Sequence, residues 1–541
     1  MSATLRDRLV IVLVALVLFV PGLGAVHLFD WDEINFAEMA REMVVTGDVL
    51  RPQIDFKPFH EKPPLFIWLQ AACMAVWGVG EFAARLPNAL CGVLTLLVIH
   101  GMGGRWRSAL FGRLWALAYV GSILPHLYFR SGIIDPWFNL FIFLGIDRII
   151  RVFNDRGRRD ALWGGLFLGL AALTKGPVGV LIPGLTVGVM LLWTRLRLRV
   201  PVVPLLWMAL ALAVTVGAWA VVDLWRNGPA FMQAFFWRQV AMLTTEDAGH
   251  GGFPGYHFVV LLVGCFPASV FALHELVRPS AQGGPQRDQR RWMVVLLLVV
   301  LVLFSVVKTK IVHYSSLCYF PLTYLAALRL EHIWTHRVAF GRSRYLLGML
   351  GSLIAAVVIA VPFLGRRPDL LRPLLAADPF ALGNLDAQVH WTGWEALAGV
   401  LLLAALVAAH FLHGARRYRS GVLVTFAGGA LFVTATLYAF INNIEAYSQR
   451  AAITFFTERQ GERCHLATKD YKSYAPWFYG RTTGPTPPEE VLFHGPVDRP
   501  VYLSCKVTSV EAVQALGTFT EIGRSNGFVF WRRDPAEAGT Q

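Results

Sequence analysis

The sequence predicts a polytopic α-helical membrane protein with a small α/β domain at its C-terminal end. Three observations predict this fold class. The chain is 55% hydrophobic and only 16% charged, whereas about a quarter of the residues in soluble domains are charged. Apolar runs of about 15 to 22 residues recur along the chain, long enough for membrane spans. From residue 442 onward the composition becomes more polar and richer in proline.

The apolar runs are expected to cross the bilayer as helices, because a helix satisfies its own backbone hydrogen bonds in lipid. Examples are residues 9–29, 202–222 and 345–364. Arginines precede the first run, as in a signal peptide, but no small-residue cleavage site follows it. The run leads instead into Trp31-Asp32-Glu33, so we expect it to be retained as the first span.

The formal net charge of +14 follows membrane topology rather than a nucleic-acid surface. Arginine clusters alternate with the apolar runs, at 105–113, 151–159, 195–199, 278–291, 329–344 and 416–419. Membrane proteins keep such basic loops on the cytoplasmic side. The pattern therefore predicts many spans and excludes nucleic acid as a partner, since the charge is not gathered in one patch.

If every basic cluster is cytoplasmic, one apolar segment is surplus. Residues 64–78 and 85–101 both lie between the first span and Arg105, yet only one of them can cross. Residues 64–78 are the shorter segment and have charged residues on both sides, so we expect them to lie on the outer leaflet or dip into it. The result is about thirteen spans, with the N-terminus inside and the C-terminus outside.

This topology divides the chain into a transmembrane domain, residues 1–441, and an external C-terminal domain, residues 442–541. In the tail, strand-like residues 501–503 and 528–530 flank a helical pattern at 510–516, which predicts an α/β fold. The outer face of the transmembrane domain collects four irregular segments, at about 30–81, 131–136, 223–255 and 366–391.

The six cysteines lack the close pairing of a zinc site. Cys464 and Cys505 both fall in the external tail, where an oxidising compartment permits a disulfide. Two reduced, partly buried thiols are the alternative, and the sequence leaves both open.

A carboxylate pair, Asp32-Glu33, directly follows the first span and therefore lies at the outer membrane boundary. A general base or a group that orients an acceptor could sit there. The alternative is a structural role, in which the pair is solvated at the interface or favours the N-terminus of a helix at 34–44.

The motif His60-Glu61-Lys62-Pro63-Pro64 follows in the same external loop. The prolines hold the preceding residues extended, which fixes the direction of Glu61 and Lys62. A lysine held in this way suits a phosphate, because it is a compact cation with three donors. The alternative is a lysine that reaches to lipid headgroups.

Further ionisable residues interrupt or border the apolar runs. Asp135-Pro136 closes the second outer loop, and Lys175 lies between two spans, where a lysine needs a partner or an aqueous cavity. Lys308 and Lys310 precede His313-Tyr314, and a phosphorylated lipid would supply the missing anion.

The loop at 246–252 combines acidic residues, His250 and glycines. Such a loop suits a mobile lid or a metal ligand, although a lone histidine in a loop is more often only solvated.

Together these motifs resemble the GT-C superfamily of glycosyltransferases, in particular the bacterial branch of the lipid A aminoarabinose transferases and the relatives of the protein O-mannosyltransferases. The likeness covers about the first 330 residues. It is carried by Trp31-Asp32-Glu33-x-x-Phe36-Ala37-Glu38, Arg41-Glu42-Met43, Gly47-Asp48, Glu61-Lys62-Pro63-Pro64, Arg85, Asp135-Pro136, Thr174-Lys175-Gly176, Glu246-Asp247-Ala248-x-His250 and Lys308-x-Lys310-x-x-x-Tyr314.

The resemblance implies a GT-C fold with periplasmic juxtamembrane helices in the bacterial inner membrane. It implies an inverting transfer of a sugar from a polyprenyl-phosphate carrier, with Asp32 as the main catalytic or acceptor-orienting carboxylate and Glu33 and Asp135 beside it. The implied ligands of the donor phosphate or carrier are Lys62, Lys175, Tyr314, Lys310, Lys308 and Arg85. Glu61 and His250 would form a metal pair, for example for zinc, although no cofactor is required.

A lipid-linked donor also follows from the compartment. No nucleotide is available outside the cytoplasmic membrane, and the sequence has neither a Walker A motif nor a dinucleotide-binding glycine loop. The donor therefore brings its energy with it, and fixed cations can neutralise the departing phosphate.

Two departures from the aminoarabinose transferases leave the sugar and the acceptor open. Asn35 stands where those enzymes commonly carry arginine, and Phe59-His60 stands in place of an aromatic pair. The acceptor is then lipid A, another envelope glycan or lipid, or a protein. A transporter or flippase is the alternative of another class, but it should show inverted repeats and midplane charges, and the sequence shows neither.

Overall fold

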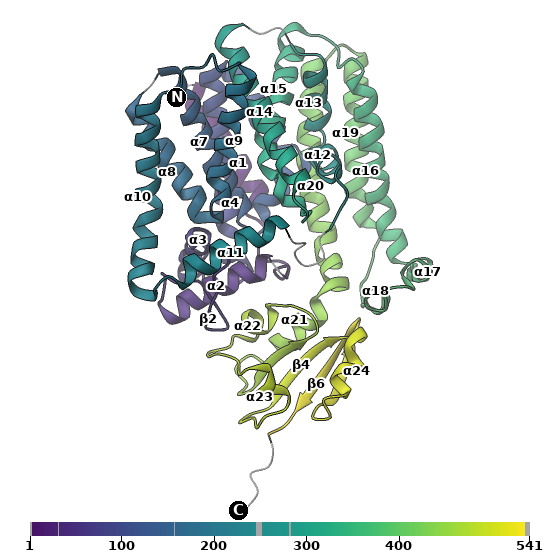
Figure 1. Ribbon diagram of the computed structural model, residues 1–541. Helices are drawn as coiled ribbons and strands as arrows, with labels where there is room; N and C mark the ends of the chain where they lie inside the picture. Colours follow the sequence, from purple (N-terminus) through teal and green to yellow (C-terminus); the bar gives the residue numbers. More distant parts are fainter. Residues whose placement is uncertain (1–2, 31, 156, 245–250, 281–282, 536–541) are drawn as a thin grey trace, which may run out of the picture.

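The structure is a computed structural model that describes residues 3–30, 32–155, 157–244, 251–280 and 283–535. Helices form a bundle, and a small sheet lies beyond one end of it (Figure 1). Helix α1 begins at the opposite end of the bundle. The bundle helices are α1 (Ala3–Phe19), α4 (Glu81–Trp106), α5 (Ala109–Val120), α7 (Asp135–Asp155), α8 (Arg158–Lys175), α9 (Val178–Trp193), α10 (Val202–Asn227), α12 (Tyr256–Gly264), α13 (Ala268–Val277), α14 (Gly284–Val306), α15 (Tyr319–His336), α16 (Ser343–Gly365), α19 (Leu397–Gly414) and α20 (Tyr418–Ser448).

Among the described residues, six helices are long and apolar enough to cross a membrane. Helices α12 and α13 form a bent pair, at 118°, that raises this number to as many as seven. The predicted class, a polytopic α-helical protein, is confirmed. The predicted number of about thirteen spans stays a prediction, because helices such as α5 and α9 are apolar but shorter. The six helices are α4, α10, α14 from Gln286, α16, α19 with the preceding turn from Trp394, and α20.

The first external loop folds into short elements at the end of the bundle that faces the sheet. Figure 1 shows α2, α3 and α11 at this end. Helix α3 has 13 residues, about 20 Å of helix, which is too short for a hydrocarbon core of about 30 Å. This length agrees with the expectation that residues 64–78 do not span and that the next segment, α4, does. The elements at this end are α2 (Asp32–Thr46), β1 (Gln53–Ile54), β2 (Lys57–Pro58), α3 (Leu65–Trp77), α11 (Ala230–Thr244), α17 (Arg372–Leu375) and α18 (Pro379–Asn384).

The C-terminal part is a four-stranded sheet with short helices, which confirms the predicted α/β fold. The strand order is β3-β4-β6-β5, with β3 parallel to β4 and the other pairs antiparallel. The expected strands at 501–503 and 528–530 lie within β4 and β6. The elements are α21 (Arg450–Thr457), β3 (His465–Lys469), α22 (Ala475–Gly480), α23 (Glu489–Phe493), β4 (Val501–Lys506), α24 (Val510–Gln514), β5 (Thr520–Ser525) and β6 (Phe528–Arg533).

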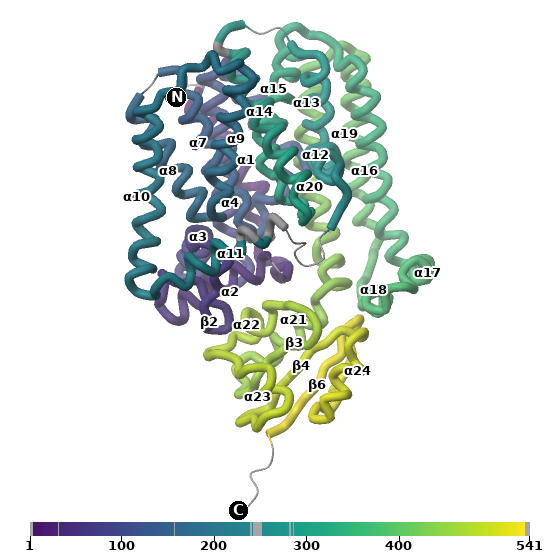
Figure 2. The backbone as a smooth tube through the Cα atoms, in the orientation of Figure 1, coloured from purple at the N-terminus to yellow at the C-terminus, as the bar shows by residue number. Residues whose placement is uncertain are grey.

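Helix α20 joins the bundle to the C-terminal part, as the continuous tube in Figure 2 shows. The predicted domain boundary at residue 442 falls inside this helix, which runs on to Ser448. The division into two domains therefore stays a prediction, and α20 has no break at the predicted position.

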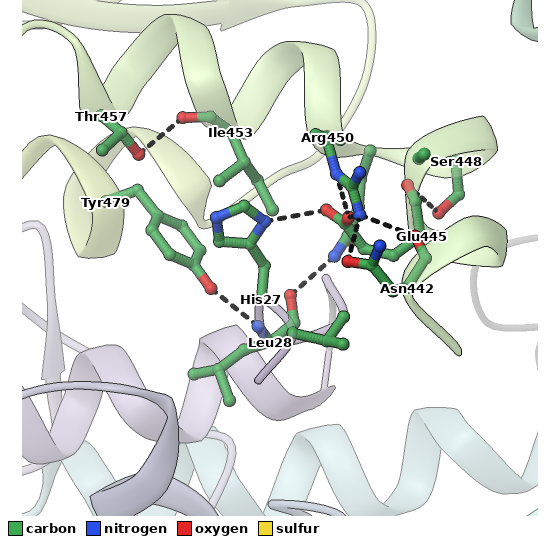
Figure 3. Close-up of polar contacts among 12 residues, drawn as sticks. His27, Leu28, Asn442, Glu445, Ser448, Arg450, Ile453, Thr457 and Tyr479 are labelled. Carbon is green, nitrogen blue, oxygen red and sulfur yellow. Dashed lines mark hydrogen bonds and ion pairs between the residues drawn. The ribbon is translucent and has the colours of Figure 1, made fainter. Parts of the chain in front are cut away.

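The residues that lead into α2 are held by the C-terminal part. In Figure 3 the His27 ring points to Glu445, and Arg450 approaches the same carboxylate. The Leu28 backbone N–H donates to the Tyr479 hydroxyl at 2.7 Å. The Tyr474 backbone N–H donates to Asp30 at 3.1 Å. The start of the first external loop thus has fixed partners far along the chain.

Cys464 and Cys505 are free thiols in the structure, which resolves the alternative that the sequence left open. The strand register gives the reason. Cys464 directly precedes β3 at the end paired with Val501, whereas Cys505 lies opposite Lys469 at the other end. The separation is about five residues of strand, roughly 16 Å, and a disulfide needs Cα atoms within about 7 Å.

All six cysteines should therefore react with maleimide when the purified protein is unfolded without reductant. Intact-mass spectrometry should show six adducts, one for each cysteine of the chain. A sample reduced before labelling is the control and should give the same mass. Two fewer adducts without reductant would contradict the free-thiol assignment.

Candidate active site

A cavity of about 1330 Å³ lies at the end of the bundle nearest the sheet. Its wall combines the first external loop, the ends of several bundle helices and a segment of the C-terminal part. The segment from Lys472 to Tyr474 reaches it from between β3 and α22. The ionisable and amide side chains of the wall include Asp32, Glu33, Asn35, Glu61, Lys62, Arg85, Asp135, Lys175, Arg238, His313, Lys472 and Tyr474.

Asp135 and Lys175 form an ion pair in this cavity. Asp135 is the first residue of α7 and is only 3% exposed, and the Lys175 Nζ donates to its Oδ1 at 2.6 Å. Lys175 is the last residue of α8, which ends because Gly176 adopts a positive φ of 87°. A carboxylate at a helix N-terminus and a cation at a C-terminus are each favoured by the helix dipole.

His313 lies between Asp32 and Asp135, two of the three carboxylates predicted as catalytic. Its Nε2 is 3.7 Å from the Asp32 Oδ2 and 3.8 Å from the Asp135 Oδ2. Burial lowers the pKa of His313 below its ordinary 6.5, although both carboxylates oppose this shift. The Asp32 side chain is 47% exposed, so it is the carboxylate that a ligand in the cavity can reach.

Lys62 presents an ammonium group that is not neutralised by direct pairing. Its side chain is half-buried, and within the described part of the chain it has no hydrogen bond or ion pair. Burial and the nearby charge of Lys175 lower its pKa, and Asp32, Glu61 and Asp135 act in the opposite direction. Three N–H donors therefore remain for a ligand.

Glu33 and Arg85 line the cavity but are fully engaged with each other and with the backbone. The Arg85 Nε and Nη2 donate to the two Glu33 oxygens at 2.9 and 2.7 Å. Its other three N–H groups donate to the carbonyls of Leu23, Val26 and His27. All five guanidinium donors are thereby used, which leaves none for a phosphate.

Glu33 also accepts hydrogen bonds from the Phe29 and Gly132 backbone N–H groups. Burial would raise the pKa of Glu33, but Arg85 and these N–H groups hold it below its ordinary value. In this geometry the pair fixes the start of α2 against α4. The predicted contact of Arg85 with the carrier and the predicted catalytic role of Glu33 stay predictions.

Lys308 and Lys310 do not line the cavity. Lys308 is exposed, while the Lys310 Nζ donates to the backbone carbonyls of Phe304, Ser305 and Val307 at the end of α14. Lys310 therefore caps the C-terminus of α14, where a lysine is favourable. The predicted contact of both lysines with the carrier stays a prediction, and this placement does not favour it. Tyr314, in contrast, lines the cavity, and its ring lies 5.2 Å from the Lys175 Nζ.

The predicted metal pair has only one described member. Glu61 lies 3.7 Å from Arg238, an ion pair rather than a metal-like arrangement. His250 lies outside the described residues. Across the residues that the structure covers, no group of three or more His, Cys, Asp or Glu side chains could hold a metal ion. The zinc pair stays a prediction.

Several cavity residues were not predicted as site residues. His313 had a signal, because it directly precedes Tyr314 in the predicted motif. Asn35 lies one turn after Asp32 on α2. Its only signal in the sequence was that it stands where the aminoarabinose transferases commonly carry arginine. Lys472 and Tyr474 come from the polar tail and had no signal in the sequence.

The Glu33–Arg85 pair should stabilise the fold. We expect Glu33→Gln to lower the free energy of unfolding by about 3–5 kcal/mol, because it leaves a buried guanidinium partly unpaired. Thermal unfolding in detergent measures the effect. Glu61→Gln is the control, since Glu61 is more exposed and its contact is longer. An equal loss in both variants would contradict the assignment.

The same pair predicts a pH dependence. The folded-state pKa of Glu33 lies below its ordinary 4.5, so its contribution is complete above about pH 4.5 and is lost as the pH falls through the folded-state value. The melting temperature of the wild type should therefore fall in acid by more than that of Glu33→Gln. Parallel pH profiles would contradict this prediction.

Comparison with known proteins supports the fold and the class of enzyme. The family model of the dolichyl-phosphate-mannose-protein mannosyltransferases matches residues 61–219. The chain is 26% identical over 412 residues to the undecaprenyl phosphate-alpha-4-amino-4-deoxy-L-arabinose arabinosyl transferase of Pectobacterium carotovorum, over 74% of this chain and 71% of the relative. It is 28% identical to the protein of that name from Pseudomonas aeruginosa, over 65% and 63% of the two chains.

A solved structure shows the same fold. The crystal structure of ArnT from Cupriavidus metallidurans bound to undecaprenyl phosphate matches with a TM-score of 0.76 over the full length of both chains, at 21% identity. The archaeal oligosaccharyltransferase AglB from Archaeoglobus fulgidus matches with a TM-score of 0.50 at 10% identity. Fold and relatives together indicate a multi-pass membrane glycosyltransferase that is similar to the undecaprenyl phosphate-dependent enzymes named above.

Proposed function

We propose that the protein transfers a sugar from a polyprenyl-phosphate donor to an acceptor of the cell envelope, on the periplasmic face of the bacterial inner membrane. The acceptor is lipid A or another envelope glycan or lipid. The observation that carries this proposal is the half-buried Lys62 ammonium beside the Asp135–Lys175 pair; this ammonium has no direct partner among the residues that the structure covers. A charged group in such a place calls for an anion, and a carrier phosphate supplies one.

Lys62 and Lys175 have different roles in phosphate binding. Asp135 already neutralises Lys175 at 2.6 Å, so Lys62 supplies the excess positive charge. When the bond between the sugar and the carrier breaks, the phosphate oxygen takes the bonding electrons. A cation that is already in place stabilises this charge without reorganisation.

An apolar wall of the same cavity suits the polyprenyl chain. It is formed by Val178, Leu181 and Ile182 of α9, by Leu303 and Phe304 of α14, and by Val307, which directly follows α14. A nucleotide-linked donor has no long apolar chain that this surface could bind. The phosphate then lies where the apolar wall meets the lysines.

Asp32 is the group that we assign to the acceptor. Its exposed carboxylate can accept the proton of an acceptor hydroxyl as the oxygen attacks the anomeric carbon and displaces the carrier phosphate. His313 lies within 3.8 Å of both Asp32 and Asp135, so it can orient the two carboxylates relative to each other. Attack opposite to the leaving phosphate inverts the anomeric configuration.

The membrane orientation follows from the same assignment. The cavity, the first external loop and the C-terminal sheet share one end of the molecule, which we place in the periplasm (Figure 1). The N-terminal end of α1 is then cytoplasmic, on the side of the arginine clusters.

A protein O-glycosyltransferase is the second candidate, because the matching family model describes protein mannosyltransferases. Mass spectrometry of envelope lipids and of glycoproteins, from cells with and without the chain, separates the two. The proposal expects a sugar-modified lipid or glycan that disappears with the chain. A modified protein in its place would support the second candidate, and no change in either would contradict both.

Asp32→Asn and Lys62→Ala should each reduce transfer from a polyprenyl-phosphate sugar by at least about 100-fold, because one removes the base and the other the phosphate cation. The measurement is product formation by purified protein in detergent or nanodiscs. Lys469→Ala, in β3 and outside the cavity, is the matched control and should keep its activity. Full activity in both site variants would refute the assignment.

A further inference from the structure

Asn35 is a buried amide in the cavity wall that has no partner. It lies on α2 and is 8% exposed, and it lines the cavity. Its Oδ1 accepts no hydrogen bond, and the side chain bonds to none of the residues that the structure describes. Other buried asparagines near the cavity have at least one partner. The Asn88 Oδ1 is also unpaired, but the Asn88 Nδ2 donates to the carbonyls of Ser131 and Ile133, and the Asn139 Nδ2 donates to the Ser316 hydroxyl.

An unpaired buried amide is unfavourable by about 1–3 kcal/mol, so its presence calls for an explanation. Packing does not supply one. The neighbours Ile34 and Phe36 are buried and apolar, and an apolar residue at position 35 would avoid the unpaired group. The remaining reason for an amide here is a ligand in the cavity.

The chemistry of the amide restricts this ligand. A carbonyl oxygen needs a donor, whereas the oxygens of an ionised phosphate only accept. A hydroxyl group both donates and accepts, so it satisfies either end of the amide. The carrier phosphate also has better partners in Lys62 and Lys175. The group that faces Asn35 is therefore a hydroxyl.

The position of Asn35 indicates which hydroxyl. It follows Asp32 by three residues on one helix, so their Cβ atoms are about 5–6 Å apart on the same face. That distance is close to the width of one sugar ring. A ring whose anomeric carbon lies beside Asp32 would place a hydroxyl at Asn35.

We propose that Asn35 is a specificity-determining residue that hydrogen-bonds a ring hydroxyl of the sugar being transferred. The inference rests on the proposed function, because it requires a sugar held next to Asp32. It adds the residue that selects among donor sugars, a role distinct from binding the phosphate.

The test compares Asn35→Ala with Asn88→Ala in thermal unfolding and steady-state kinetics. Asn35→Ala should keep or raise the melting temperature, because it removes an unpaired group, whereas Asn88→Ala should lower it. Asn35→Ala should also raise the KM for the polyprenyl-phosphate sugar by about 5- to 50-fold, and leave the KM for the acceptor unchanged. Unchanged kinetics, a higher acceptor KM, or a melting temperature as low as that of Asn88→Ala would each overturn the proposal.

Donors that each lack one ring hydroxyl locate the contact. Wild-type protein should lose activity with one of these deoxy donors more than with the others, and Asn35→Ala should lose that difference. Equal discrimination by both proteins would overturn the assignment.

Binding of undecaprenyl phosphate, which carries no sugar, separates this inference from the proposed function. Asn35→Ala should bind it as the wild type does, and Lys62→Ala should bind it at least about tenfold more weakly. Weaker binding by Asn35→Ala would overturn the inference about the sugar. Unchanged binding by Lys62→Ala would instead overturn the phosphate site of the proposed function.

Discussion

The Lys62 ammonium, which has no hydrogen bond or ion pair within the described part of the chain, is the constraint on which the account of this protein depends. Ionisable groups near the hydrocarbon are unfavourable unless they are paired or solvated. The cavity pairs Lys175 with Asp135, whereas none of the described residues forms a hydrogen bond or ion pair with Lys62. The site therefore has a built-in preference for an anion, and the apolar wall beside it favours an anion attached to a lipid.

The rest of the fold keeps this arrangement rigid. The buried Glu33–Arg85 pair fixes the start of α2, so that Asp32 and Asn35 face the cavity. The C-terminal part holds the residues just before α2, through Tyr479 and through Tyr474. The C-terminal part is thus more than an appendage, because it holds the loop that carries Asp32.

Much of this architecture could be predicted from the sequence, for a physical reason. Ionisable residues beside apolar runs are rare, so Asp32, Lys62, Asp135 and Lys175 stood out, and the structure places all four around one cavity. The partner of each group could not be predicted. Arg85 and Lys310 share the charge of Lys62, but the fold directs one to Glu33 and the other to backbone carbonyls. Asn35 is a neutral residue whose unpaired state appears only after its neighbours are in place. Whether Cys464 and Cys505 can form a disulfide depends on the register of β3 and β4, and the spacing of the cysteines in the sequence does not reveal that register.

The central claim is that Lys62 and Lys175 hold the carrier phosphate beside Asp32 and Asp135. An electron cryo-microscopy structure of the protein with undecaprenyl phosphate tests it most directly. The account predicts phosphate density within hydrogen-bonding distance of the Lys62 Nζ, with the polyprenyl chain between α9 and α14. Phosphate density at Lys308, or elsewhere away from the Asp135–Lys175 pair, would contradict it.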